Sequence, residues 1–598
     1  MLIDVIGKLA HSLLRARFLP SLLKWRLPLQ LGGFPTCSTL FATHYLRSFH
    51  AKVRECKLAS AILFLDVKSA FHSMVRQIVF GPAQAMPSHL QALLTDAGCD
   101  PEALRQTFEA TSAAFHEDVS VADQRLLQDA HVYTWFGLAG TDEAFCTARG
   151  SRPGSPLADI AFNAMMTHVL QALHDRLDRC IPLQQGFHAL GLKAPPVAWV
   201  DDVAVPIVVT ECAILETTLA EVAHLTHDVF LQFGLSLNFK TKKTEAVVSF
   251  RGLDAPAHRH SVLVERLGKI DIVPLNMQLQ CVASYEHLGT IFAADCTLQR
   301  EVAHRRVKAV QAMRQVGKPI LRNRHVSVVT RLKLFECLIV PVILHGAGGW
   351  DLLPHRLYHS LHSSIMSWQR SIINDGCWTD DQHTDFELQC MWKLPPLALR
   401  LAKARLLYAF HCLAAGPSLL VDFLTSVAHD PQGWFAALRR ALVWLASMDA
   451  SFCPLDLHRD TVEQILSWFA AHQKHGPQRV RSLYRRCLLQ FHVVGHIVAL
   501  HKQLRSTLED GGVAFEVADE PALIPDDAKF ACDWCSAQFD AKQKLQAHMW
   551  TAHQLISDER KFVFSDTCLA CKDASGLQRA SSNIYVFLVF YLMAAMLR

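Results

Sequence analysis

The sequence predicts an α+β fold that continues into a helical region and ends in a small ββα unit. Short β-branched and apolar runs in the first half of the chain end on Asp, as Ala61 to Leu65 does before Asp66. From about Leu298 to Ala450 the apolar residues recur at helical spacing. Near the C-terminus, two Cys and two His have the spacing of ligands that share one metal ion.

Composition identifies a globular chain with room for several domains. The 598 residues are 51% hydrophobic and 19% charged, which excludes a disordered protein. The net charge of +4 identifies no partner, but the basic residues are clustered. Residues 299 to 333 hold ten Lys or Arg and one acid, Glu301, and residues 474 to 505 hold seven and no acid. Such clusters attract phosphate backbones, although a solvated helix face gives the same pattern.

Cysteine usage predicts a reducing compartment, the nucleus or the cytoplasm. The 18 Cys are scattered and no secretory signal opens the chain. The first 30 residues are basic and amphipathic, and we expect a structural helix there rather than a transit peptide. Residues 584 to 597 are 14 apolar residues, short for a membrane span. We expect no membrane partner, and this tail leaves only a weak membrane alternative.

The first candidate site residue follows a strand. In "AILFLDVKSAFHSM" a buried strand ends at Asp66, and a helix then places Ala70, Phe71 and Met74 on one face. A core aromatic is the plain interpretation of Phe71.

Two adjacent carboxylates interrupt the next apolar run. Residues 197 to 200 and 203 to 209 are apolar, and Asp201 and Asp202 lie between them, which predicts a β-hairpin. Asp is common in turns, so a turn alone explains the pair. The alternative is a metal site, because two close carboxylates in a partly dry place repel unless a cation compensates them. Their hard oxygens suit Mg²⁺, and a two-metal site needs a third carboxylate.

Three further segments complete the first half. "RGSRPGSPLADIAFN" predicts a Gly/Pro loop that enters a helix, with Ser155 as its N-cap. "GLSLNFKTKKTEAVVSFRG" predicts a helix end, a basic loop and a strand, and "SYEHLGTIF" predicts a strand and a turn. Gly150 and Gly154 in the first of these allow the backbone to approach a ligand closely.

The metal-binding pattern near the C-terminus is specific. Cys532-x2-Cys535-x12-His548-x4-His553 carries Phe539 and Leu545 where a ββα finger has its small core. It predicts one structural Zn²⁺. "CLAC", at 568 to 571, is half of a second finger, and no His follows it.

The order of these segments resembles the reverse transcriptase domain of non-LTR (LINE-type) retrotransposons, over residues 1 to 350. The motifs are "FLDVKSAFHSM", "RGSRPGSPLADIAFN", "WVDD", "NFKTKKTEAVVSFRG" and "YEHLG". "QLGGFPTCST" is similar to part of the fingers, and "KLFECLIVPVILHGAGGW" to the end of the thumb. Each motif alone is weak, and five in this order make a strong signal.

The resemblance implies a right-hand polymerase. Residues 1–297 would form partial fingers and the palm, and 298–380 the thumb. A helical connector (381–527), the zinc finger (528–556), and a broken second finger with the apolar tail (557–598) would follow. The partners implied are an RNA template, a DNA primer or target, and deoxynucleoside triphosphates.

The resemblance also implies roles for single residues. Asp66, Asp201 and Asp202 would hold two catalytic Mg²⁺ ions, and Phe71 would lie under the sugar and exclude a 2′-hydroxyl. The nucleotide or template would be bound by Gly150, Arg152, Gly154 and Lys243. The primer would be gripped by Tyr285, Leu288 and Gly289.

Some positions depart from the family pattern. Pro153 stands where Gln is frequent, and His72 where Asp is frequent. The likeness begins inside the fingers, and no endonuclease segment is present. The alternative is therefore a catalytically decayed, truncated copy that acts at most as a nucleic-acid-binding zinc-finger protein.

Overall fold

The computed structural model describes most of the chain in two compact units. The described residues are 5–76, 79, 119–131, 134–137, 140–147, 149–152, 154–373, 384–455, 460–510, 530–531, 538–539, 544–545 and 548. The first unit joins Met1–Glu301 with Ala415–His429, and the second joins Val302–Ala414 with Asp430–Arg598. The predictions on Cys532, Cys535, His553, Pro153, the half finger and the apolar tail lie outside the described residues.

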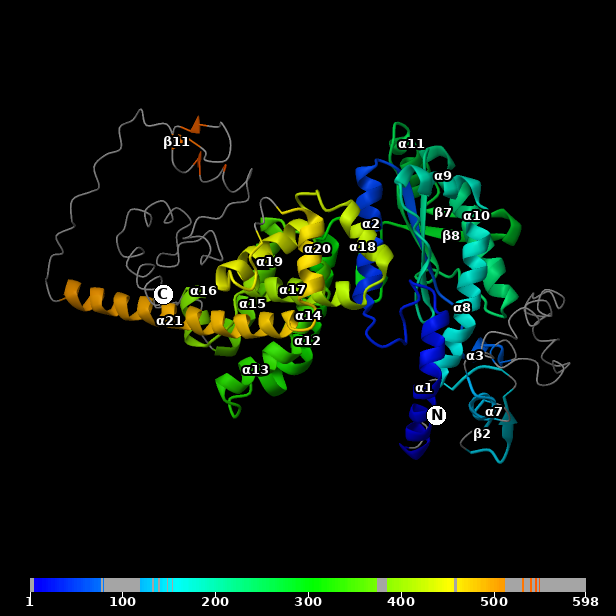
Figure 1. The fold of residues 1–598 in the computed structure, drawn as a ribbon, viewed down its shortest axis with the longest axis horizontal. Helices are drawn as coiled ribbons and strands as arrows, with labels where there is room; N and C mark the ends of the chain where they lie inside the picture. Colours follow the sequence, from blue (N-terminus) through cyan, green and yellow to red (C-terminus); the bar gives the residue numbers. More distant parts are fainter. Residues whose placement is uncertain are drawn as a thin grey trace. The chain divides into compact units, whose positions relative to one another are not determined.

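A six-stranded mixed sheet forms the centre of the first unit (Figure 1). Its order is β4 (Val197–Trp199), β5 (Asp202–Val209), β1 (Ala59–Leu65), β6 (Glu245–Ser249), β8 (Met277–Val282) and β7 (Lys269–Ile272). Neighbours are antiparallel, apart from the parallel pair β6 and β8. All seven residues of β1 are buried, as expected for a central strand covered on both faces. The predicted strands and the Asp-Asp hairpin are confirmed.

Helices cover this sheet, with α2 (Thr39–Glu55) on one face and α8 (Ala158–Leu177) and α10 (Leu215–Gln232) on the other (Figure 1). Ser38 begins α2, because its hydroxyl accepts a hydrogen bond from the Leu40 amide at 3.2 Å. The remaining elements of the unit are α1 (Val5–Trp25), α3 (Ala70–Ser73), α7 (Val121–Asp129), β2 (Trp135–Gly137), β3 (Ala144–Cys146), α9 (Ile181–Leu190), α11 (Ala255–His260), β9 (Ser284–His287) and β10 (Thr290–Ala293).

One helix of the predicted connector belongs to the first unit. In α18 (Ser418–Ser426), Phe423 is buried and lies edge-to-face against Tyr45 and Phe49 of α2, with ring centroids 5.5 Å and 6.2 Å apart. The chain thus leaves the second unit after α17 and re-enters it at Asp430.

The second unit is helical in its described part, apart from one short hairpin near the C-terminus. Its helices are α12 (Gln299–Val316, which starts in the first unit), α13 (Val328–Leu338), α14 (Val340–Ile343), α15 (His355–Ile373), α16 (Asp385–Met391), α17 (Leu397–Ala415), α19 (Trp434–Met448), α20 (Val462–Ala471) and α21 (Gly476–Asp510). Trp350, Phe335, Phe410 and Phe469 are fully buried in it. The predicted helical pattern is confirmed.

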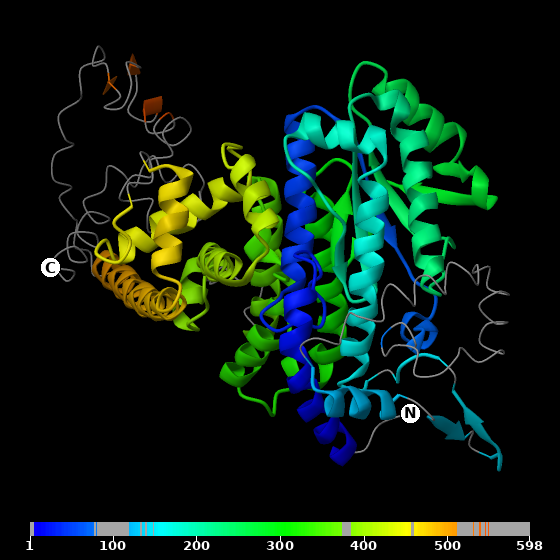
Figure 2. The same ribbon diagram turned by 45° about the vertical axis from the view of Figure 1, so that its right-hand side comes forward.

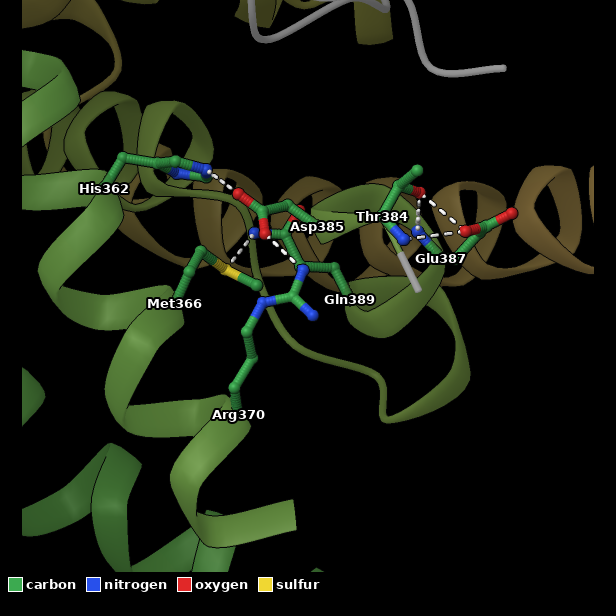
Figure 3. A network of polar contacts seen from close by, with 7 residues as sticks. All are labelled: His362, Met366, Arg370, Thr384, Asp385, Glu387 and Gln389. Carbon is green, nitrogen blue, oxygen red and sulfur yellow. Dashed lines mark hydrogen bonds and ion pairs between the residues drawn. The ribbon is translucent and has the colours of Figure 1, made fainter. Parts of the chain in front are cut away.

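A polar network joins α15 and α16 (Figure 3). Asp385 accepts hydrogen bonds from His362 at 2.9 Å and from Arg370 at 2.7 Å. Thr384 and Glu387 form a capping box that starts α16. Although burial opposes the shift, these two donors lower the pKa of Asp385.

The described residues between 530 and 548 form a short hairpin, followed by helical residues at 544, 545 and 548. β11 (Phe530–Ala531) pairs with β12 (Gln538–Phe539), and the Phe539 ring lies 4.8 Å from the His548 ring. This is the order of elements that the Cys/His spacing predicts.

None of the described helices combines the length and the apolar character that a bilayer crossing requires.

Candidate active site

The sheet brings the predicted carboxylates to one end of neighbouring strands. Antiparallel pairing of β1 and β5 ends at Leu65 with Val203, so Asp66 and Asp202 come one step later on adjacent strands. Trp199 pairs with Asp202 across the β4–β5 hairpin, which leaves Asp201 in its turn. Residues far apart in sequence therefore share one edge.

The tight hairpin turn is braced by the segment before α2. Val200 has φ 59°, and Leu31 donates to the Ala198 carbonyl at 2.8 Å. A Cβ on Gly32 would lie 2.2 Å from the Val200 nitrogen, so only glycine allows this approach. The motif that the sequence assigned to the fingers holds the Asp-Asp turn in place.

The three carboxylates repel one another. Burial first, and then the charges of Asp201 and Asp66, raise the pKa of Asp202 to about 6, while Lys243 opposes them. Burial and then Asp66 raise the pKa of Asp201, against its backbone hydrogen bond. The Asp202 side chain remains accessible to solvent on one side, although the surrounding chain desolvates it. Such a cluster gains from a bound cation.

Asp66 already has two partners from the loop after α10. Its Oδ1 accepts from Lys243 Nζ and its Oδ2 from Asn238 Nδ2, both at 3.1 Å. The Tyr285 hydroxyl donates to the Lys243 carbonyl at 2.9 Å, and its ring stacks on Phe64 at 4.5 Å. Lys243 and Tyr285, predicted from separate motifs, thus meet at the carboxylates.

The carboxylates suit Mg²⁺ in their place and their chemistry. Hard oxygens are the ligands Mg²⁺ prefers, and burial together with the neighbouring carboxylates raises the pKa of Asp201 and Asp202. In their present conformations, no three His, Cys, Asp or Glu of the described residues are arranged around a common metal position. The Lys243 ammonium now occupies one acceptor position of Asp66 Oδ1.

The Gly-rich loop is hydrogen-bonded to the turn that carries Phe71. Gly150 donates to the Met74 carbonyl at 2.7 Å, and Ser151 donates to the Phe71 carbonyl at 2.8 Å. With φ 83°, Gly150 leaves no room for a side chain, since a Cβ would lie 2.6 Å from the His72 oxygen.

Two local predictions about this region were wrong. The helix after Asp66 ends at Ser73, before Met74, because the loop amides bind carbonyls that a longer helix would use. The helix after the Gly-rich loop begins at Ala158, and Ser155 instead accepts from the Leu157 amide at 3.2 Å.

Phe71 is half-buried. Its ring lies 4.8 Å from Phe162 of α8, and part of it remains accessible. One face packs in the core while the rest can contact a ligand. Gly154 has φ 82° with open space around it, and Arg152 is exposed.

Arg76 is a site residue that sequence reasoning missed. This buried guanidinium donates to the carbonyls of Gly150 at 2.7 Å, Thr147 at 2.8 Å and Arg149 at 3.2 Å, and to the hydroxyls of Thr134 and Thr147. Burial lowers the pKa of Arg76 to about 10, so it stays charged at neutral pH. An Arg after a short apolar turn carries no signal of this role.

The predicted primer grip is a β-hairpin. Leu288 (φ 49°) and Gly289 (φ 73°) form the two-residue turn of β9 and β10, with the left-handed backbone of a type I′ turn. Of the three predicted residues, the structure gives contacts near the carboxylates for Tyr285. Burial first, then Asp202 and Asp66, raise the pKa of its phenol.

Comparison with known proteins gives little. No protein-family model and no curated protein matches the chain. Among solved structures, the chain is similar to a telomerase from Candida albicans, solved with the TWJ fragment of telomeric RNA, with 11% identity and a TM-score of 0.28. The match covers 78% of this chain and 56% of that chain, so this chain spans about half of the telomerase. At this TM-score the likeness supports no conclusion about function.

Proposed function

We propose that this chain is an RNA-directed DNA polymerase of a retroelement. The observation that carries the proposal is the position of Asp66 and Asp202 on adjacent strands, with Asp201 in the joining turn. A turn alone would not require the third carboxylate, and no internal pairing neutralises Asp202 in the described structure.

Asp66, Asp201 and Asp202 would hold two Mg²⁺ ions. When bound, these ions supply charge stabilisation for an in-line phosphoryl transfer and lower the pKa of the primer 3′-hydroxyl. Lys243, which now donates to Asp66, would give a proton to the leaving pyrophosphate.

The turn and the Gly-rich loop would bind the incoming nucleotide. The accessible part of Phe71 would lie against the sugar and exclude a 2′-hydroxyl. Arg76 would fix the loop, so that Gly150, Arg152 and Gly154 meet the nucleotide or template at a constant distance from Phe71.

Exposed basic side chains of residues 302–333 would contact the template–primer backbone. They are Arg306, Lys308, Arg314, Lys318, Arg322, Arg324 and Lys333. Lys and Arg bind phosphates without sequence preference, which suits a polymerase that copies any template.

Primer extension by the purified full chain on an RNA template, with Mg²⁺ and deoxynucleotides, tests the proposal. We expect extension with RNA and faithful dependence on template sequence. The Lys243 and Asn238 contacts that cover Asp66 favour one alternative, a decayed copy. Binding of RNA without any primer extension would support that alternative and contradict the proposed polymerase activity.

We also propose that Cys532, Cys535, His548 and His553 bind one structural Zn²⁺. The spacing and the nearby hairpin with Phe539 support it. Metal analysis of the full chain should find one zinc, which Cys532→Ser should remove. Zinc-free wild-type protein, purified without chelator, would contradict it.

A further inference from the structure

Three cations gather where α17 and α21 meet in the second unit. The Lys403 ammonium of α17 lies 4.3 Å from the ring centre of Tyr484 of α21. Arg481 and Arg485 are one helical turn apart on α21, and both are exposed. We name Lys403, Arg481 and Arg485 the cationic cluster.

The nearest acid is already used by the protein. Glu336 accepts a bidentate pair of hydrogen bonds from Arg400, one at 2.7 Å, and a third from Gln369 at 3.3 Å. Burial lowers the pKa of Lys403, and Arg400, Arg481 and Arg485 lower it further, against Glu336. In the part of the chain that the structure describes, the cluster therefore has excess positive charge.

Other arginines of α21 serve the fold instead. Arg479 pairs with Asp449, and Arg486 donates to the Met448 carbonyl. These two are seven positions apart and share one face of the helix, whereas Arg481 and Arg485 share another. Among the arginines of α21 whose side chains the structure describes, Arg479 and Arg486 thus bind the protein, and Arg481 and Arg485 lie on the other face without a hydrogen bond or ion pair to the described residues.

We propose that the cationic cluster binds the phosphodiester backbone of nucleic acid. A guanidinium forms two parallel hydrogen bonds to one phosphate, and two of them at i and i+4 can bind successive phosphates along the helix. Residues 474 to 505 contain no acid that would repel the strand.

This inference goes beyond the proposed polymerase and does not depend on it. It assigns nucleic-acid binding to particular side chains of the connector helices, where the sequence left phosphate attraction and a solvated helix face both open. Binding is measured without added Mg²⁺ or nucleotides, so its outcome is separate from that of primer extension.

The test is fluorescence anisotropy with the full chain, without added Mg²⁺ or nucleotides, and a labelled 30-nucleotide single-stranded RNA. A second arm uses DNA of the same sequence. The variant is Arg481→Gln with Arg485→Gln. The matched control is Arg356→Gln with Lys393→Gln, two exposed residues of the same unit that are not among the charges acting on Lys403.

We expect the cluster variant to bind both nucleic acids on the order of tenfold more weakly than wild type. The slope of log K against log salt should fall by about 1.4, the value for two lost single-strand contacts. The control should lose less than half of this slope. Circular dichroism confirms folding, which exposed substitutions should preserve.

Equal weakening by the cluster variant and the control would overturn the proposal, because it would show bulk attraction only. Unchanged binding would overturn it as well, and would leave a protein partner for this face. Weakening with RNA alone would contradict recognition through the shared phosphodiester backbone.

Discussion

Asp202 in the first unit and Asp385 in the second are carboxylates in opposite situations. Asp385 is paired with His362 and Arg370, and these two donors lower its pKa against the effect of burial (Figure 3). Asp202 lies among Asp201 and Asp66, and its pKa is raised to about 6, first by burial. Figure 2 shows the same fold from a second direction.

The difference separates a structural carboxylate from a candidate functional one. A carboxylate whose charge is balanced by its own protein contributes stability and needs no ligand. A carboxylate held beside like charges costs stability, and the cost is recovered only when a cation binds. The predictions below test whether the two classes behave differently.

The largest effect is expected from Asp201→Asn. If the carboxylates hold the catalytic metals, extension should fall at least about 1000-fold, since several kcal/mol of charge stabilisation is lost. The fold should be unaffected or slightly more stable, because one repelling charge is removed. Asp175→Asn, an exposed carboxylate on α8, is the control in both primer extension and thermal unfolding. Normal primer extension by Asp201→Asn would show that Asp201 and Asp202 only form a turn.

Phe71→Val should change selectivity rather than fold. Replacing the half-buried ring with the smaller valine side chain would open space beside the sugar. The ratio of ribonucleotide to deoxynucleotide incorporation should therefore rise about 10- to 100-fold. Single-nucleotide extension assays give the ratio. Phe162→Leu, which changes the buried partner ring, should leave it within a few-fold. An unaltered ratio in an active Phe71 variant would return this residue to the core.

Arg76 is a cation satisfied by its own protein, and its loss should loosen the Gly-rich loop. Arg76→Ala would leave buried carbonyls without donors, at a cost of about 2 kcal/mol. Hydrogen exchange at Gly150 and Ser151 should then accelerate about 30-fold. Arg179→Ala, an exposed arginine, is the control. Unaltered exchange in the Arg76 variant would show that the backbone hydrogen bonds hold the loop alone.

The smallest effect is expected from Asp385→Asn. Replacing the paired carboxylate should lower the free energy of unfolding by about 1 kcal/mol at neutral pH and leave primer extension intact. A lowered carboxylate pKa stabilises the fold above the unfolded value of about 3.9, and this contribution disappears as pH falls through the folded value. The difference between wild type and variant, followed by urea unfolding, should therefore shrink as pH falls below about 3.9 and vanish once pH is below the folded pKa of Asp385. A difference that persists there would exclude the ionic pairing as its cause.

The sequence alone determined the features that depend on neighbours along the chain. Asp66 ends an apolar run, and Asp201 with Asp202 interrupts a β-branched one, so a strand end and a hairpin followed from period and turn chemistry. The helical character of the second half followed from the same kind of pattern. The Cys and His spacing near the C-terminus is also local, because one turn and one helix supply all four ligands.

Only the tertiary structure decided which distant residues meet. The register of β1 and β5 placed Asp202 beside Asp66, and a shift of one residue would have turned the carboxylates to opposite faces. The bonds of Arg76 to the Gly-rich loop, the packing of α18 in the first unit and the meeting of Lys403 with Tyr484 also join distant segments. Hydrophobic periodicity shows that one face of an element is buried, but not which other segment packs against it, because many segments could bury the same apolar area. Shape and hydrogen-bond geometry select one of them, and both exist only in the folded chain.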